Sequence, residues 1–221
     1  MIEAVIFDMD GVLIDSEPVW QMHEKKAIEE ACGFEITPEM QNETFGLNTA
    51  EVIMHWYHYK PWANLNAHAI TDKIYTKVLD HFKANGIPAN GVPEILDFFK
   101  MRNIPMGVAS SSPQHLIDAI LDKLGIRNYF LVAHSSDQEA YGKPHPDVYI
   151  NTCKALKANP AYCLAFEDSV NGMIAAKSAR MKVIAIPPAI KKSQKEYVLA
   201  DLVLNDLAAF TSTHFNQLTQ K

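Results

Sequence analysis

A short acidic motif directly after an apolar run constrains the fold of this chain more than any other feature. The run Ala4–Phe7 contains four apolar residues and is followed by Asp8, Asp10 and Gly11. Such a run is typical of a strand that is buried on both faces of a parallel sheet. The aspartates then lie at the carboxyl end of the strand, where open α/β sheets bind ligands, and Gly11 allows a sharp turn behind them.

The two aspartates are two residues apart, so their side chains point the same way as the chain leaves the strand. Adjacent carboxylates favour a divalent cation, and Mg²⁺ prefers carboxylate, phosphate and water oxygens. Once the charge is balanced, one aspartate can attack phosphorus while the other donates and accepts a proton. The alternative is a loop whose aspartates only cap turns or helices. We favour that alternative for Asp15 and Ser16, either of which suits a helix N-cap.

Three serines, Ser110, Ser111 and Ser112, follow a second apolar stretch at residues 106–109. They are typical of a helix start, with Ser112 suited to the N-cap and Pro113 to the first helical position. A helix amino terminus also binds anions, so the structural and the phosphate-binding interpretations describe the same geometry.

Two further polar segments follow in the second half of the chain. Lys143 precedes Pro144, and the acidic pair Glu167-Asp168 follows the strand-like stretch 163–166. Taken alone, the lysine could be a surface residue and the acids could start a helix. An early Asp-x-Asp motif together with a second acidic pair at another strand end makes coincidence a poor explanation.

The four segments occur in the same order as the motifs of haloacid dehalogenase-like hydrolases, and the chain resembles that superfamily. The resemblance implies that Asp8 is the nucleophile and Asp10 the general acid and base. The residues that it implies for the phosphoryl group are Ser110, Ser111 and Lys143. The residues that it implies for Mg²⁺ are Asp8, Asp10, Glu167 and Asp168.

Composition limits the other classes of function. The chain has 221 residues, 48% of them hydrophobic, and a formal net charge of −6, which suits one α/β core with a modest second unit. Without a basic run, a nucleic-acid partner is not expected. No apolar stretch approaches the roughly 20 residues of a membrane span. Three scattered cysteines argue against a disulfide framework, so we expect a cytoplasmic protein, and we expect it to be a monomer.

The pattern along the chain predicts two domains. Residues 1–15 and 86–221 form a Rossmann-like core with a doubly wound parallel sheet, and residues 16–85 form an inserted α-helical cap. In the insertion, helices are predicted from Ser16 to about Cys32 and from Asn48 to Lys60. A further helix is predicted from the apolar stripe Ile70, Ile74, Val78 and Phe82 and ends at Asn85-Gly86. In the core, strands are expected near residues 104–109, 130–133, 162–166, 182–186 and 202–204. Helices are expected near residues 93–99, 113–123, 146–157 and 170–180, with a last helix from about Asp206.

The insertion resembles that of a subgroup containing β-phosphoglucomutase and phosphatases of sugar and polyol phosphates. The mutase pattern has a histidine in the first insertion helix, where this chain has Trp20, and an arginine where this chain reads Gly46-Leu47-Asn48-Thr49. The arrangement of aromatic residues in the insertion is similar to that in bacterial hexitol and 2-deoxyglucose-6-phosphate phosphatases; it consists of Trp20, Trp56-Tyr57 and Pro61-Trp62. We expect Trp20, Asn48 and Trp62 to influence specificity, although core packing explains the tryptophans equally well.

The resulting expectation is a Mg²⁺-dependent phosphatase that hydrolyses small phosphorylated sugars or polyols through an aspartyl-phosphate. One alternative is a sugar phosphomutase, which needs groups that retain a bisphosphate; Trp20 and Asn48 argue against it. Another is a signalling receiver domain, which carries its phosphorylated aspartate on a middle strand and lacks a helical insertion.

Overall fold

The computed structural model describes residues 2–192 and 194–219. Contacts divide the chain into two compact units, Met1–Asp15 with Ile87–Lys221, and Ser16–Gly86. We call the first the sheet unit and the second the helical unit. Where the chain returns to the sheet unit, the Ala89 amide donates a hydrogen bond of 3.0 Å to the Leu13 carbonyl. The two ends of the insertion are thereby joined within the sheet unit.

The sheet unit is built on six parallel strands in the order β3-β2-β1-β4-β5-β6. The strands are β1 (Ala4–Phe7), β2 (Met106–Ser110), β3 (Val132–Ser135), β4 (Cys163–Glu167), β5 (Lys182–Ala185) and β6 (Leu202–Val203). The chain runs outward from β1 to β3 and then crosses back to β4. The order therefore reverses beside β1, and a crevice for ligands opens at such a point.

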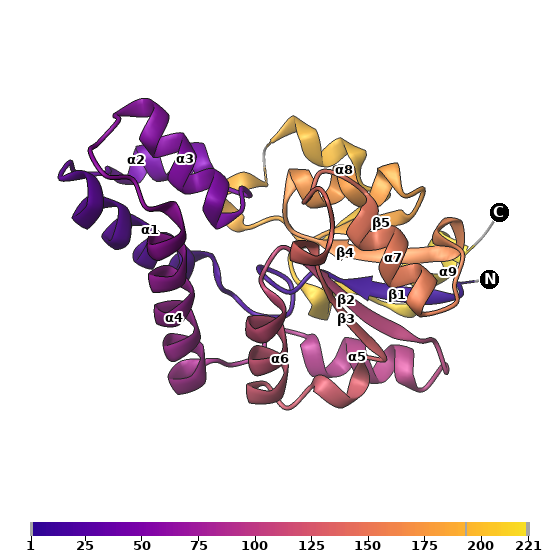
Figure 1. Ribbon diagram of the computed structural model, residues 1–221. Coiled ribbons are helices and arrows are strands. Elements are labelled where there is room, and N and C mark those ends of the chain that lie inside the picture. The colour runs from indigo at the N-terminus through magenta and orange to yellow at the C-terminus, as the bar shows by residue number, and fades with distance from the viewer. Residues whose placement is uncertain (1, 193, 220–221) are drawn as a thin grey trace. The chain divides into compact units, whose positions relative to one another are not determined.

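Helices cover both faces of this sheet, as Figure 1 shows. The helices of the sheet unit are α5 (Val92–Lys100), α6 (Gln114–Lys123), α7 (Asp147–Ala155), α8 (Val170–Ser178) and α9 (Ser212–Thr219). In Figure 1, α7 and α8 lie on one face and α5 and α6 on the other. The predicted α/β fold with a doubly wound parallel sheet is confirmed.

Side chains alternate across β1 because successive residues of a strand point to opposite faces. On one face, Phe7 stacks on Phe166 with ring centroids 4.8 Å apart and meets the edge of Phe99 at 6.2 Å. On the other face, Ile6 packs in the cluster that contains Tyr149 and Met173. Both faces of the central strand are thus dry, which explains the unbroken apolar run before Asp8.

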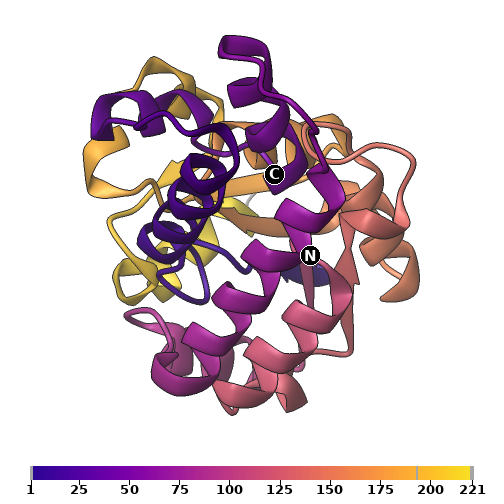
Figure 2. The same ribbon diagram turned by 60° about the vertical axis from the view of Figure 1, so that its left-hand side comes forward.

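The helical unit contains no strand between Ser16 and Gly86. Its helices are α1 (Glu17–Cys32), α2 (Pro38–Gln41), α3 (Thr49–Tyr59) and α4 (Ala67–Asn85). α1 packs against both α3 and α4, and the pairing of α1 with α4 can be followed in Figure 2. α4 buries Ile74, Val78 and Phe82, while Ile70 of the predicted stripe is half-buried.

The expected last helix starts later than predicted. Asp206 caps only a short 3₁₀ turn, Leu207–Ala209, through a hydrogen bond of 3.0 Å from the Ala209 amide, and α9 begins at Ser212. The interruption has a packing cause. Phe210 is extended and places its ring 5.7 Å from that of Phe99 in the core. Among the described residues, no helix combines the length and the apolar character needed to cross a membrane.

Candidate active site

The candidate site lies where β1, β2 and β4 end side by side. Phe7 is in register with Val108 of β2 and Phe166 of β4. The next residues are Asp8, which directly follows β1, and Glu167, which ends β4. The Asp8 amide donates to the Phe166 carbonyl at 2.9 Å, which fixes the chain as it leaves β1. Parallel pairing therefore brings together groups that are far apart in sequence.

A buried lysine connects these strand ends. The Lys143 ammonium lies 2.9 Å from Asp8 Oδ1, 2.6 Å from Glu167 Oε1 and 3.0 Å from the Ala109 carbonyl oxygen. The lysine residue is 8% exposed, and the glutamate is fully buried. One ammonium thus uses its three donors on three strand ends.

For both Asp8 and Lys143, burial and the attraction to the opposite charge shift the pKa in opposite directions. Burial raises the pKa of Asp8 to about 8, although the neighbouring Lys143 ammonium opposes the shift. For Lys143, burial would lower the pKa, but attraction to Asp8 and Glu167 outweighs it and raises the pKa. The lysine therefore stays charged, and the Asp8 carboxylate needs further positive charge to ionise fully at neutral pH.

Three buried carboxylates form the group that could hold a metal ion. Asp8, Glu167 and Asp168 each offer an oxygen, and these oxygens lie within 4.8 Å of one another. Gly11 allows this approach: its φ is +76°, and a Cβ there would lie 2.1 Å from Asp168 Oδ2. Any side chain at this position would displace the carboxylate. The absence of a side chain at Gly11 therefore makes room for the Asp168 carboxylate beside the Asp-x-Asp motif.

Glu167 is held from several sides. Its Oε1 accepts hydrogen bonds from Lys143 and the Tyr149 hydroxyl, and its Oε2 accepts one of 3.3 Å from Ser169 Oγ. A Cβ at Gly172 would lie 2.1 Å from the carboxylate, so α8 also approaches it closely. Both oxygens are therefore engaged by the chain itself.

Asp10 belongs to a neighbouring network. Its Oδ2 accepts a hydrogen bond of 2.7 Å from Ser112 Oγ and one of 3.3 Å from Ser110 Oγ. The predicted helix start is wrong by one residue. The backbone of Pro113 is extended, with ψ of 149°, so Pro113 occupies the N-cap and α6 begins at Gln114. The Ser112 hydroxyl bonds to Asp10 instead of capping the helix. Ser111 stands between the two serines and is half-buried.

The structure places the three predicted specificity residues of the helical unit in different surroundings. Trp20 meets the edge of Tyr75 with ring centroids 5.9 Å apart. Asn48 caps α3 in a full capping box: its side chain accepts from the Glu51 amide at 3.0 Å, and the Glu51 carboxylate accepts from the Asn48 amide at 3.0 Å. This cap gives Asn48 a structural role of its own.

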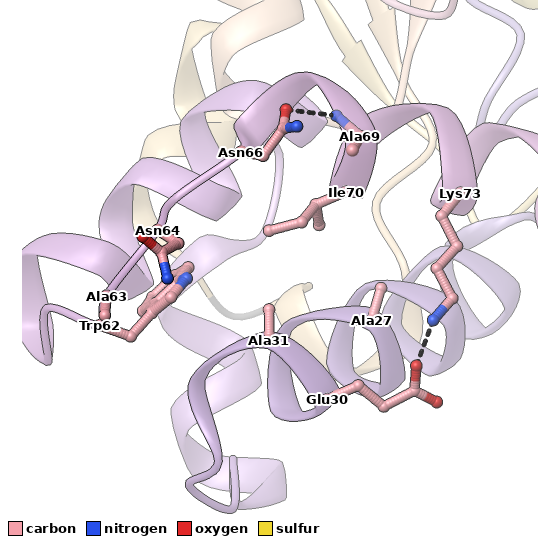
Figure 3. A pocket seen from close by; sticks show the side chains of 10 residues that line it. All are labelled: Ala27, Glu30, Ala31, Trp62, Ala63, Asn64, Asn66, Ala69, Ile70 and Lys73. Carbon is pink, nitrogen blue, oxygen red and sulfur yellow. Dashed lines mark hydrogen bonds and ion pairs between the residues drawn. The ribbon is translucent and has the colours of Figure 1, made fainter.

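Trp62 packs edge-on against Tyr57, with ring centroids 5.1 Å apart, and lines an open pocket of about 370 Å³ in the helical unit. Figure 3 shows Trp62 and Asn64 on one side of this pocket and the ion pair of Glu30 with Lys73 on the other. Trp20 is not among the residues that line it. The two tryptophans thus occupy distinct places in the helical unit.

Two tyrosines of the site were missed by the sequence interpretation. Tyr149 is fully buried, contacts Glu167, and has its pKa raised by burial and by the nearby carboxylates. The Tyr197 hydroxyl donates to the Asp168 carbonyl at 2.6 Å. Tyr149 follows Lys143 on the first turn of the next helix, and that closeness in sequence was the available signal. Tyr197 lies in a 3₁₀ turn without a motif, so nothing indicated it.

Comparison with known proteins places this chain in a family. A family model described as haloacid dehalogenase-like hydrolase matches residues 2–180. Hexitol phosphatase B of Escherichia coli (strain K12) is 34% identical over 210 residues, which cover 95% of this chain and 94% of that protein. A phosphorylated carbohydrates phosphatase of Thermotoga maritima is 32% identical over 188 residues, covering 82% and 83%.

A solved structure supports the fold. The crystal structure of CbbY from Rhodobacter sphaeroides in complex with phosphate has a TM-score of 0.82 to this chain at 24% identity, and the match covers 95% of this chain and 96% of that one. The predicted superfamily is therefore confirmed by the sequence matches, and the solved structure agrees with the fold. This chain belongs to the haloacid dehalogenase-like hydrolase family.

Proposed function

We propose that this protein is a Mg²⁺-dependent phosphatase of small phosphorylated sugars or polyols. The observation that carries the proposal is the buried contact of Asp8 with Lys143 beside a second acidic pair. The names of the two phosphatases described above support sugar or polyol phosphates as the substrate class. In this proposal the sheet unit performs the chemistry, and the helical unit acts as a cap that selects the substrate.

The reaction proceeds in two steps on the residues of the chain. An Asp8 carboxylate oxygen attacks phosphorus in line, the bond from phosphorus to the leaving oxygen breaks, and Asp10 protonates that oxygen. The Asp10 carboxylate then takes a proton from water, whose oxygen attacks phosphorus and breaks the bond to Asp8. Alcohol and inorganic phosphate leave, and both aspartates return to their initial state. Ser110, Ser111 and Lys143 bind the phosphoryl oxygens during both steps.

The acidic group fits Mg²⁺, which prefers oxygen ligands. Asp8 and Asp168 would bind it directly, whereas Glu167 would act through its charge or through water, because both of its oxygens already accept hydrogen bonds from the chain. The Asp10 carboxylate accepts hydrogen bonds from Ser110 and Ser112, so we assign it to proton transfer. If Asp10 contributes to metal binding, it would do so through an atom outside its carboxylate group. When bound, the cation supplies charge neutralisation for the attack of one anion on another.

The first test is phosphate release from a panel of hexitol, hexose and nucleotide monophosphates, measured with Mg²⁺ and with a chelator. We expect release from hexitol or hexose phosphates and a loss of at least about 100-fold on chelation, since a catalytic metal supplies several kcal/mol. β-Glucose-1-phosphate is included, and its conversion to glucose-6-phosphate is followed in parallel. Isomerisation without release would establish the mutase instead, and inactivity on the whole panel would contradict an enzymatic role.

Trp20 provides a test of the helical unit as a cap. Trp20→Ala should lower kcat/KM for the preferred sugar or polyol phosphate by about 5- to 10-fold, because a lost aromatic contact is worth about 1 to 1.5 kcal/mol. Turnover of p-nitrophenyl phosphate, a small generic ester, should change less than about 2-fold. Trp62→Ala, at the separate open pocket, is measured beside it. Equal losses on both substrates in the Trp20 variant would count against a role in specificity.

A further inference from the structure

A single carboxylate oxygen of Asp10 accepts hydrogen bonds from two serine hydroxyl groups, one at the end of β2 and one in the loop that follows. Ser112 Oγ donates to Asp10 Oδ2 at 2.7 Å, and Ser110 Oγ donates to the same atom at 3.3 Å. The shorter contact comes from the serine that no motif of the sequence assigned to catalysis.

The two serines differ in what they can do when substrate binds. A serine hydroxyl carries one proton, so Ser110 cannot donate to Asp10 and to a phosphoryl oxygen at the same time. Under the proposed function, on which this step rests, Ser110 turns its proton to the phosphoryl group. Ser112 then remains as the hydroxyl of this loop that donates to Asp10.

The position of Ser112 is fixed by the sheet. Ser112 is 5% exposed; its amide donates to Ser110 Oγ at 3.0 Å, and its carbonyl accepts from Ser135 Oγ at 2.7 Å. Ser135 ends β3, is fully buried, and is in register with Ser110 of β2. The ends of β2 and β3 therefore hold Ser112 in place, which lets a short hydroxyl orient a neighbouring group.

We propose that Ser112 is a positioning residue that orients Asp10 for proton transfer. With Oδ2 held by Ser112, Asp10 uses Oδ1 to donate its proton to the leaving oxygen as the bond to phosphorus breaks. In the second step the same Oδ1 takes a proton from the attacking water. Oδ2 accepts a hydrogen bond in both protonation states of the carboxyl group, so the contact with Ser112 persists through the cycle.

The test compares two leaving groups in the full-length enzyme. A polyol phosphate releases an alkoxide that must be protonated, whereas p-nitrophenyl phosphate releases a phenoxide that is stable without a proton. Ser112→Ala should lower kcat/KM for the polyol phosphate by about 10- to 100-fold and for p-nitrophenyl phosphate by less than about 3-fold. The ratio kcat/KM is used because it reports the steps up to release of the leaving group.

Matched variants separate positioning from structure. Ser112→Cys keeps the size but is a weak donor, so it should reproduce the selective loss, and Ser112→Thr keeps the hydroxyl and should restore the ratio between substrates. Thr152→Val removes another buried hydroxyl, one that bonds to the Val148 carbonyl within α7, and should leave both substrates unchanged. Thermal unfolding of each variant checks that the fold is retained.

Equal losses on both substrates in Ser112→Ala and Ser112→Cys would overturn the proposal, as would the absence of a loss. Measuring Asp10→Asn on the same two substrates shows whether such a result contradicts only the role of Ser112 or the proposed function as well. If Asp10→Asn also loses activity equally on both substrates, the assignment of Asp10 as general acid is wrong. If it shows a selective loss that the Ser112 variants lack, the phosphatase mechanism stands and the positioning role is wrong.

Discussion

Asp8→Asn is expected to lower turnover by about 10⁴-fold or more, the range found when a catalytic nucleophile is removed. The amide oxygen of asparagine is a poor nucleophile, so no bond to phosphorus forms. The fold should persist, because asparagine has nearly the same shape and the Lys143 ammonium keeps its contacts with Glu167 and the Ala109 carbonyl. Phosphate release from the preferred substrate measures the loss, and thermal unfolding checks the fold.

Asp15→Asn is the control for the loss of a charge from the same region. Asp15 is exposed and follows the same motif, and we assign it no part in the reaction. Its replacement should change turnover less than about 2-fold, as for a surface substitution away from the site. Substantial Mg²⁺-dependent activity in Asp8→Asn, with Asp15→Asn unchanged, would remove Asp8 from the role of nucleophile.

Lys143→Met is expected to affect stability and activity together. The substitution leaves the buried carboxylates of Asp8 and Glu167 without the ammonium that contacts both. Removing one partner of a buried ion pair costs about 3–5 kcal/mol, so the free energy of unfolding should fall by this amount in chelator. Turnover should fall about 10³-fold or more, because the phosphoryl group loses a fixed positive charge. Urea unfolding and phosphate release measure the two effects.

Two further variants test whether burial of the ion pair causes the loss of stability expected for Lys143→Met. Lys177 pairs with Asp201 at 2.6 Å, but both side chains are about one-third exposed, so Lys177→Met should cost less than about 1 kcal/mol. The double variant Lys143→Met/Glu167→Gln removes one uncompensated carboxylate, so it should regain part of the stability and none of the activity. Wild-type stability in Lys143→Met would contradict the importance of the ion pair.

The sequence was sufficient to predict that the polar segments lie at strand ends on one edge of the sheet. The apolar runs before Asp8, Ser110 and Glu167 indicate buried parallel strands, and the carboxyl ends of such strands must lie at one edge of the sheet. Lys143 was predicted from its motif, but its simultaneous contact with Asp8, Glu167 and the Ala109 carbonyl depends on the path of the chain after β3. A pattern of residue types carries no information on that path.

The missed features depend on the direction of individual side chains. Ser112 fits a helix N-cap equally well by composition, and only the approach of Asp10 decides where its hydroxyl points. Tyr149 could equally have been an apolar residue of the α7 core, because its hydroxyl matters only through Glu167. The late start of α9 follows from the packing of Phe210 on Phe99, a contact between residues more than a hundred positions apart.

The hydrogen bond between the Ala89 amide and the Leu13 carbonyl has a consequence for how such proteins diversify. Since the exit and the return of the chain are joined inside the sheet unit, the segment between them is a closed loop whose ends are held independently of its content. The entropy cost of such a loop grows only slowly with its length, about 0.6 kcal/mol per doubling. We therefore expect that a helical insertion of different size and surface can be joined at this junction while the acidic strand ends keep their register.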